Sequence, residues 1–271
     1  MTILQAILLG IVEGVTEFLP VSSTGHLLLA ERALGLTHDE AADAYAICIQ
    51  AGAILAVLGL YRARVTQMLR GLIGRDGPGL RLAVNVVIAF MPAAVCGLAF
   101  SHTIKEHLFG LWPVVAAWTA GGIAIMALRG RMTGGRAGIA DIDMRTAALI
   151  GVAQCLALWP GTSRSLATIV GGVLLGLSLP AAVEFSFLLG LLTLLAATAH
   201  DAHKHGAAMV SEFGITTLLV GTAAAAVSAA VSVRWLVGWL QSHGMEIFAA
   251  WRIGLAIIVA ALLLMGVLPA G

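Results

Sequence analysis

Charged residues are scarce in this sequence. Only 11% of its 271 residues are Asp, Glu, Lys or Arg, whereas 60% are hydrophobic and the mean hydropathy is +0.99. In a typical soluble domain, roughly a quarter of the residues are charged. The shortage argues against a soluble globular protein, and the formal net charge of +1 gives no sign of a nucleic-acid partner.

Cysteine is also scarce, and the start of the chain lacks the features of a signal peptide. The three cysteines lie in apolar stretches and form no Cys-x-x-Cys pair, which argues against a disulfide framework or a zinc site. The N-terminal apolar run has no basic start and is interrupted by Glu13 and Glu17. We therefore expect no cleaved leader here.

Long apolar stretches dominate what remains. Two regions, 1–35 and 146–179, are interrupted by LPVSSTGH and WPGTSRS. Proline ends a helix and Ser or Thr favours the start of the next one, so each region is predicted to form a re-entrant helical hairpin. Six other stretches are long enough to cross ~30 Å of hydrocarbon. They are residues 43–61, 80–100, 111–128, 182–200, 213–233 and 249–268.

The predicted fold is therefore an all-α integral membrane protein, a single domain over residues 1–271 with six transmembrane helices and two hairpins. The two interrupted regions also resemble each other, because GIVEGVTEFLPVSST aligns with GVAQCLALWPGTSRS. This alignment pairs Glu13 with Gln154, 141 residues later. Together with three predicted spans after each hairpin, it indicates an internal duplication of residues 1–128 and 146–268.

Arginines predict the orientation. Nine of the 15 basic residues are arginines in segments 62–81 and 129–145, which the positive-inside rule places in the cytoplasm. When membrane crossings are counted from these two cytoplasmic segments, the first hairpin enters from outside and the second from the cytoplasm, so the halves are predicted to be inverted repeats. Inverted-repeat transporters place their sites near the midplane, where broken helices meet. We therefore expect the site at the hairpin tips.

The first arm of the first hairpin carries two acids. Glu13 and Glu17 are spaced i, i+4 and share one helix face. Each would cost at least a few kcal/mol if it faced lipid at membrane depth, so they indicate a buried site; the alternative is a solvated pair at the interface. Gly10 and Gly14 form a GxxxG pair, which is more often a packing motif than a chemical one.

The turn and the second arm add hydroxyl and imidazole groups. Ser22, Ser23 and Thr24 precede His26, and helix capping alone would need a single hydroxyl. A histidine near a helix N-terminus is biased toward its neutral form by the helix dipole, which suits a general base or a nucleophile. The alternative is a histidine whose role is only to bond a neighbour.

The second hairpin carries a cation. Ser163, Arg164, Ser165 and Thr168 follow a Pro-Gly turn in an apolar segment. The guanidinium fork matches phosphate or carboxylate groups, and the free N–H groups of a helix start also bind anions. The structural alternative pairs Arg164 with an acid of the first hairpin, and the two interpretations are compatible.

The remaining polar residues receive lesser roles. Asp43 and Glu184 are expected to cap or anchor helix starts, Gln50 to bond between helices, and Arg252 to snorkel to the interface. Residues 200–205, HDAHKH, could bind a metal, but a solvated external loop is the favoured interpretation.

The two motifs together resemble one known family. EGVTEFLPVSSTGH (13–26) and PGTSRSLAT (160–168) are similar to the undecaprenyl-diphosphatase family of bacitracin-resistance membrane phosphatases, and the resemblance extends over essentially the whole chain. It implies hydrolysis of undecaprenyl diphosphate to the monophosphate, which recycles the lipid carrier for peptidoglycan synthesis and confers bacitracin resistance. It also implies a site on the periplasmic side of the bacterial inner membrane.

The resemblance implies roles for particular residues. Catalysis is expected to involve Glu13, Glu17, Ser23, His26 and Arg164. Phosphate binding is expected to involve Ser22, Ser163, Arg164, Ser165 and Thr168. A divalent cation, Mg²⁺ or Ca²⁺, is expected on Glu13 and Glu17. The nucleophile stays open between Ser23, His26 and water, with Glu17 or His26 as its base.

The expected partners are a polyprenyl diphosphate and membrane lipids, and a homodimer is possible. The main alternative function is a transporter or flippase for a phosphorylated lipid or an anion, because inverted repeats with broken helices are typical of transporters. Two carboxylates, a histidine and serines opposite an arginine exceed what anion binding requires. The sequence therefore favours an enzyme.

Overall fold

The computed structural model describes residues 1–36, 40–108, 110–132 and 134–269, and in this part of the chain every regular element is helical. The all-α prediction is thus confirmed. The helices are α1 (Ile3–Thr16), α2 (Ser23–Ala33), α3 (Glu40–Leu60), α4 (Arg62–Leu72), α5 (Gly77–Leu108), α6 (Leu111–Leu128), α7 (Met144–Gln154), α8 (Arg164–Leu174), α9 (Leu179–Trp239) and α10 (Glu246–Leu264), with the 3₁₀ helices η1 (Ile139–Asp141) and η2 (Cys155–Leu158).

The transmembrane prediction agrees with these helices. Five segments are long and apolar enough to cross a membrane, and α3 with α4, bent by 82° at their junction, makes a sixth when the pair is counted as one span. The five are Gly77–Phe100, Leu111–Leu128, Leu179–His200, Met209–Trp239 and Glu246–Leu264. Each of the six predicted stretches coincides with one of these segments.

The connection after the fourth predicted stretch differs from the prediction. Residues 200–205 were expected to lie in an external loop, but α9 continues through them as a helix. Residues 200–212 are rich in Ala and other good helix formers, and the backbone breaks only at Gly214, whose φ of 74° favours glycine. Within the described residues no group of three or more His, Cys, Asp or Glu could hold a metal ion. The side chains of His205 and Asp43 lie outside the described residues.

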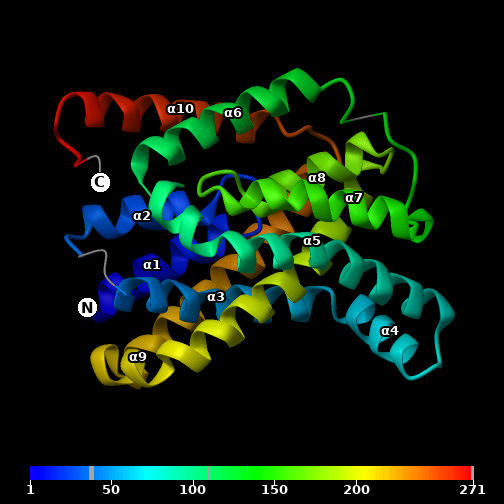
Figure 1. The fold of residues 1–271 in the computed structure, drawn as a ribbon, viewed down its shortest axis with the longest axis horizontal. Helices are drawn as coiled ribbons and strands as arrows, with labels where there is room; N and C mark the ends of the chain where they lie inside the picture. Colours follow the sequence, from blue (N-terminus) through cyan, green and yellow to red (C-terminus); the bar gives the residue numbers. More distant parts are fainter. Residues whose placement is uncertain (37–39, 109, 133, 270–271) are drawn as a thin grey trace.

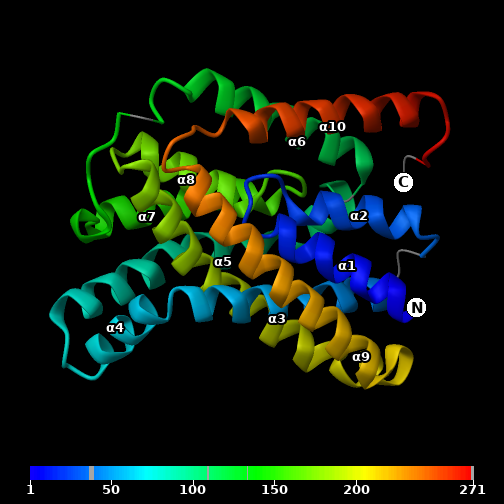
Figure 2. The ribbon, with the colours of Figure 1, turned by 180° about the vertical axis from the view of Figure 1, so that it is seen from behind.

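Both interrupted regions form helix–turn–helix hairpins, as predicted. In Figures 1 and 2, the α1–α2 hairpin enters the bundle from the end that carries both chain termini, and the α7–α8 hairpin enters from the opposite end. The two turns meet in the interior, between the long spans. This arrangement brings residues from near 20 and near 160 together.

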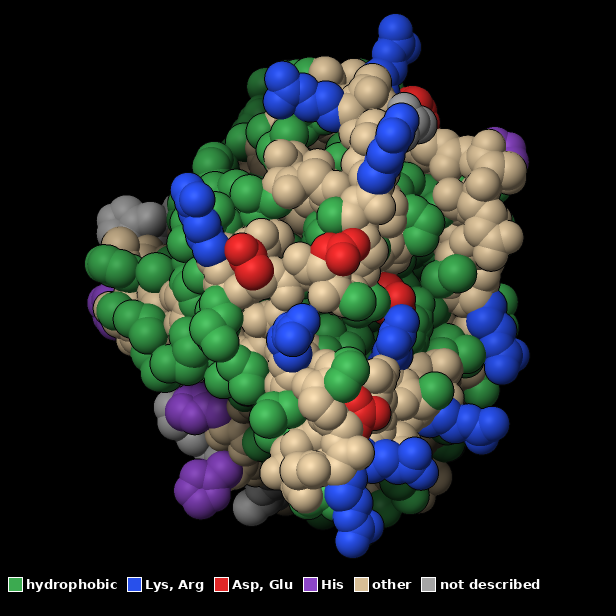
Figure 3. Space-filling view, turned by 90° about the vertical axis from the view of Figure 1, so that its right-hand side faces the viewer, with side chains coloured by type: hydrophobic (Ala, Val, Ile, Leu, Met, Phe, Trp, Pro, Cys, Tyr) green, Lys and Arg blue, Asp and Glu red, His purple; other side chains and the backbone are tan. Residues whose placement is uncertain are grey.

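One end of the molecule collects arginine. Segments 62–81 and 129–145, which hold nine arginines, lie at the α4 end of the bundle (Figure 1), and Figure 3 looks onto this end and shows its many basic side chains. Glu184, near the start of α9, accepts a 2.7 Å bond from Arg64 of α4, which fits its predicted anchoring role. The assignment of this end to the cytoplasm stays a prediction.

The first hairpin is held tightly against α9. A Cβ on Gly10 would lie 2.3 Å from the carbonyl oxygen of Gly221, and a Cβ on Gly14 would lie 2.2 Å from that of Ala225. Ser232 of α9 donates a 3.0 Å bond to the Gly14 carbonyl. The GxxxG pair therefore serves packing, as expected, and fixes where the acids of α1 point.

Candidate active site

The two hairpin turns share an unusual backbone. In the described chain, the non-glycine residues with positive φ are Ser22, at 75°, and Ser163, at 76°. They are 141 residues apart, the spacing that also pairs Glu13 with Gln154, and each directly precedes the first residue of the returning helix. Such strain costs about 1–3 kcal/mol and gathers at functional sites. The match supports the predicted duplication, which stays a prediction.

Three consecutive carbonyl groups of the first turn are satisfied by side chains from three other helices. Proline and the irregular turn leave these groups without helical partners, and inside a membrane each unsatisfied group would cost several kcal/mol. The bonds are Ser165 Oγ to the Leu19 oxygen at 3.0 Å, Arg252 Nη1 to the Pro20 oxygen at 3.2 Å, and Trp118 Nε1 to the Val21 oxygen at 3.0 Å. The turn is thus built jointly by α8, α10 and α6.

Arg252 joins both turns. Its side chain is fully buried, and Nη2 donates to the carbonyl oxygens of Gly161, in the second turn, and Ala117, each at 2.9 Å. Gly121 makes room for it, because a Cβ there would lie 2.3 Å from Nη2. The predicted snorkelling of Arg252 to the interface is therefore wrong, since the turn carbonyls provide interior partners for its guanidinium.

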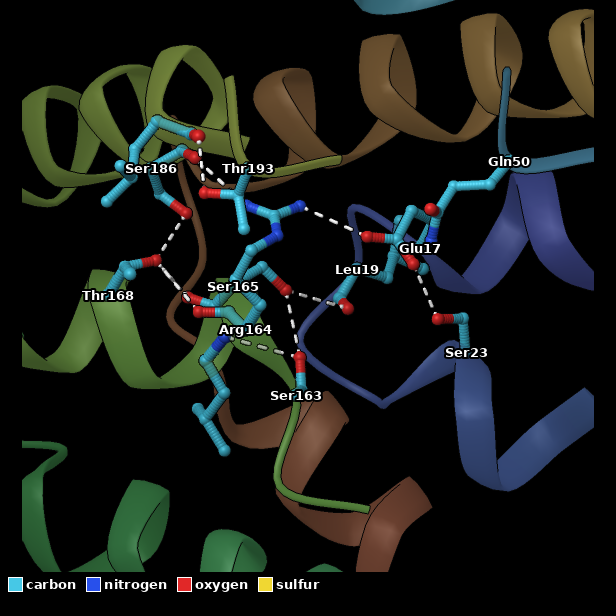
Figure 4. A network of polar contacts seen from close by, with 12 residues as sticks. Glu17, Leu19, Ser23, Gln50, Ser163, Arg164, Ser165, Thr168, Ser186 and Thr193 are labelled. Atoms are coloured by element: carbon cyan, nitrogen blue, oxygen red, sulfur yellow. Dashed lines mark hydrogen bonds and ion pairs between the residues drawn. The ribbon is translucent and has the colours of Figure 1, made fainter. Parts of the chain in front are cut away.

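An ion pair connects the two hairpins (Figure 4). Arg164 Nη2 lies 3.2 Å from Glu17 Oε1, and both side chains are at least 90% buried. Arg164 Nη1 also donates to the Ser186 carbonyl at 3.0 Å, and the guanidinium carbon lies 5.4 Å from the centre of the Phe18 ring. Gly190 of α9 leaves the space, since a Cβ there would lie 2.2 Å from Nη1. The structural pairing considered for Arg164 is therefore present.

The acids and a serine form a short chain of contacts. Ser23 Oγ donates to Glu17 Oε2 at 2.5 Å, so one carboxylate connects the hydroxyl to the arginine. Glu13 is 1% exposed, lies beside Glu17 and Gln50, and its Oε1 has no hydrogen-bond partner within the described structure. The alternative of a solvated interfacial pair is wrong, because both acids are buried.

The hydroxyl groups of the second hairpin are occupied within the protein. Ser163 Oγ accepts from the Leu166 N–H at 3.3 Å and lies 3.0 Å from Ser165 Oγ. Thr168 Oγ1 lies 2.6 Å from Ser186 Oγ. These bonds fix α8 against the first turn and against α9.

His26 is held by its two ring nitrogens. Nδ1 lies 2.7 Å from the Ser22 carbonyl oxygen, and Nε2 accepts from Trp251 Nε1 at 2.9 Å. An Nε2 that accepts while Nδ1 donates requires the neutral tautomer, in agreement with the sequence-based expectation. The ring supports Ser22, the strained residue before Ser23, and does not contact Ser23 Oγ or Glu17 among the hydrogen bonds described.

A cavity of about 550 Å³ opens beside these groups. Its polar wall brings together Glu17, Ser22, Ser23, Gln50, Gln154, Ser163, Arg164 and Thr193. Its apolar wall comes from α5, η2 and α9, with Phe90, Ala94, Leu98, Leu158 and Leu194. The lining reaches Leu98 and His200, near the far ends of the spans Gly77–Phe100 and Leu179–His200, both of which begin near α4 at the arginine-rich end.

The backbone adds positive potential to the polar wall. The first residues of α2 and of α8 both line the cavity, so the N-termini of two helices, whose dipoles favour anions, lie at the same space. Arg164 lies on the same wall and adds a positive charge to it. The structure thus places five of the nine predicted site residues on the cavity: Glu17, Ser22, Ser23, Ser163 and Arg164.

The other four predicted residues, Glu13, His26, Ser165 and Thr168, do not belong to the described cavity lining. Sequence reasoning missed Gln154 and Thr193 as cavity residues and Arg252 as the connection between turns. For Gln154 a signal was present, since it aligns with Glu13. Arg252 stood out as an arginine inside an apolar span.

Fold and site together define a multi-pass α-helical membrane protein with a partly polar cavity at the tips of two hairpins. The family model described as "Bacitracin resistance protein BacA" matches residues 6–258. The chain belongs to this family.

Curated relatives carry a more specific name. Proteins named undecaprenyl-diphosphatase from Sorangium cellulosum and Nitrosomonas europaea are 46% and 45% identical to the chain, over 94% and 95% of its length and 84% and 93% of theirs. "Undecaprenyl-diphosphatase 2" of Rhodospirillum rubrum is 43% identical, over 96% of this chain and 94% of its own. The resemblance found in the two motifs is thus confirmed.

Proposed function

We propose that this protein hydrolyses undecaprenyl diphosphate to undecaprenyl phosphate and inorganic phosphate in the bacterial inner membrane. The observation that carries this function is the contact chain from Arg164 through Glu17 to Ser23, beside a cavity that two helix N-termini face. Anion binding would be served by the arginine and the helix ends. A serine bonded to a carboxylate adds a nucleophile with its base.

The shape and polarity of the cavity suit a lipid diphosphate. A charged head group needs the polar wall, and a prenyl chain needs an apolar path out of the cavity. The apolar wall on α5, η2 and α9 supplies that path, and exposed apolar residues such as Leu98 lie at its end. Because the cavity reaches the end opposite the arginines, entry of the head group from the periplasmic side is part of the proposal.

The geometry favours Ser23 over His26 as the nucleophile, because Ser23 lines the cavity and has Glu17 at 2.5 Å. Ser23 Oγ attacks the terminal phosphorus while its proton passes to Glu17. The bond from that phosphorus to the bridging oxygen breaks, and undecaprenyl phosphate leaves with the electron pair and takes the proton from Glu17. Water then attacks the phosphoserine, Glu17 accepts a water proton and returns it to Ser23 Oγ, and inorganic phosphate leaves.

Charge stabilisation supplies most of the catalysis in phosphoryl transfer. Arg164 and the N-termini of α2 and α8 neutralise the equatorial oxygens, while Ser163 shapes the wall beside them. The orphaned Oε1 of Glu13, next to Glu17, fits a divalent cation, because Mg²⁺ binds proteins through one or two carboxylates together with substrate phosphates. When bound, Mg²⁺ or Ca²⁺ would neutralise diphosphate charge.

Phosphate release tests the function directly. Purified protein in detergent is expected to release inorganic phosphate from undecaprenyl diphosphate, to lose this activity with a chelator, and to regain it with Mg²⁺ or Ca²⁺. Activity that a chelator leaves unchanged would exclude the cation. Movement of the diphosphate lipid between the leaflets of vesicles, with no phosphate released, would instead favour a transporter.

Rapid quenching is expected to trap a phosphoenzyme in the parent protein. Ser23→Ala is expected to abolish its formation. Phosphoserine survives acid and is cleaved by base, whereas phosphohistidine shows the opposite lability. An acid-stable adduct mapped to Ser23 is therefore expected, and it should persist in His26→Gln even if that variant turns over slowly. An acid-labile adduct on His26 would contradict the assignment.

A further inference from the structure

We propose that Gln154 binds the substrate, donating a hydrogen bond from its side-chain amide to a phosphate oxygen of the diphosphate. This inference rests on the proposed function and extends it to a residue outside both motifs. Gln154 is the last residue of α7, lies 2% exposed, and lines the cavity together with Arg164 and Glu17.

The amide has a free donor at the cavity. Its Nε2 has no hydrogen-bond partner within the described structure, whereas Oε1 accepts a bond from Thr193 Oγ1 at 3.4 Å. Buried polar groups are nearly always paired, so an orphaned donor on a cavity wall indicates a ligand that pairs with it. Arg164 Nε is a second buried donor without a described partner on the same wall.

The residue type also fits an anion. The 141-residue offset pairs Gln154 with Glu13, so the two hairpins present an amide and a carboxylate at corresponding places. A carboxylate at 154 would repel the diphosphate and compete with it for Arg164. An amide keeps the size and offers two N–H donors instead. The first hairpin thus offers a carboxylate, Glu13, that suits a cation, and the second offers an amide, Gln154, that suits the phosphate.

Gln154→Leu tests the proposal by separating stability from binding. Leucine removes a buried, unpaired donor, so the substrate-free variant is expected to keep or raise its Tm. At the same time kcat/KM for undecaprenyl diphosphate should fall at least tenfold, mostly through KM, because a hydrogen bond to a charged acceptor is lost. Gln154→Glu should be worse than the leucine variant. A purely structural glutamine would lower Tm and activity together.

Asn85→Leu is the matched control. Asn85 is an equally buried amide, 2% exposed, but its Nδ2 donates to the Ile142 carbonyl at 2.7 Å and it does not belong to the described lining. Its replacement should lower Tm and leave KM unchanged at a permissive temperature. Values of kcat/KM within twofold of the parent for Gln154→Leu, or full activity of Gln154→Glu, would overturn the proposal.

A binding measurement keeps the test independent of turnover. Inorganic pyrophosphate is expected to raise the Tm of the parent protein and to do so at least tenfold less potently in Gln154→Leu. Equal potency for both proteins would overturn the role of Gln154. A parent protein that binds pyrophosphate through Gln154 but releases no phosphate from the lipid would refute the proposed hydrolysis and leave the binding residue in place.

Discussion

Arg164→Lys is expected to lower the rate of phosphate release by about 10³-fold while the protein stays folded. The lysine keeps the positive charge beside Glu17 but loses the planar fork, which now bonds Glu17 and the Ser186 carbonyl at once. Removing a single charge-stabilising group from a transition state costs on the order of 10²–10³ in kcat, and arginines in phosphoryl transfer contribute 10³–10⁵.

The choice of substitution matters, because Arg164→Ala would leave Glu17 as a buried, unpaired charge, which costs about 3–5 kcal/mol. A double variant, Arg164→Met with Glu17→Gln, removes both charges and should fold while remaining inactive. Arg64→Lys is the matched control, since Arg64 also pairs with a glutamate, Glu184, but lies away from the cavity lining. Near-normal turnover by Arg164→Lys would rule out the phosphate clamp.

Arg252→Met should lower both the Tm and the activity, although Arg252 is absent from the described cavity lining. The substitution leaves the Pro20 and Gly161 carbonyl oxygens without their donor, at a cost of roughly 1–3 kcal/mol for each buried group. We expect a Tm lower by several degrees and phosphate release at least tenfold lower at temperatures where the variant is folded, because the two turns that carry Ser23 and Arg164 lose their connection.

Two further variants make this expectation specific. Arg252→Lys should be intermediate, since an ammonium group cannot reproduce the spread of the guanidinium fork. Gly121→Ala should act in the same direction, because its Cβ would press on Nη2. Arg234→Met, at an exposed position of α9, is the control and should change neither Tm nor turnover. Full activity of folded Arg252→Met would show that the turns hold their places without it.

Much of the fold was accessible from local pattern. Apolar length predicted the spans, and Pro20 and Pro160 with the hydroxyl residues after them predicted the hairpins, because these signals lie within a few residues of the structure they determine. The continuation of α9 through 200–205 was missed, since a polar loop and a polar stretch of helix have similar composition. Only the position of Gly214 marked the break.

The site was predictable in its chemistry but less so in its geometry. The motifs gave Glu17, Ser23 and Arg164, which the structure joins in one chain of contacts. They could not show that the hydroxyl groups of Ser165 and Thr168 bond other parts of the protein, or that the His26 ring bonds Trp251. Such outcomes depend on which helix lies opposite each side chain, and the partners in these bonds lie 18 to 225 positions apart in the sequence.

The position of Arg252 also has a consequence for biogenesis. It lies in α10, which is translated after both of the turns that it joins, near residues 20 and 161. Both turns, with the residues proposed for catalysis, are therefore synthesised before the side chain that joins them. A nascent chain shortened before α10 would hold every residue of the contact chain but lack the donor to the Pro20 and Gly161 carbonyl oxygens, so we expect the two turns to be joined only after α10 has been inserted.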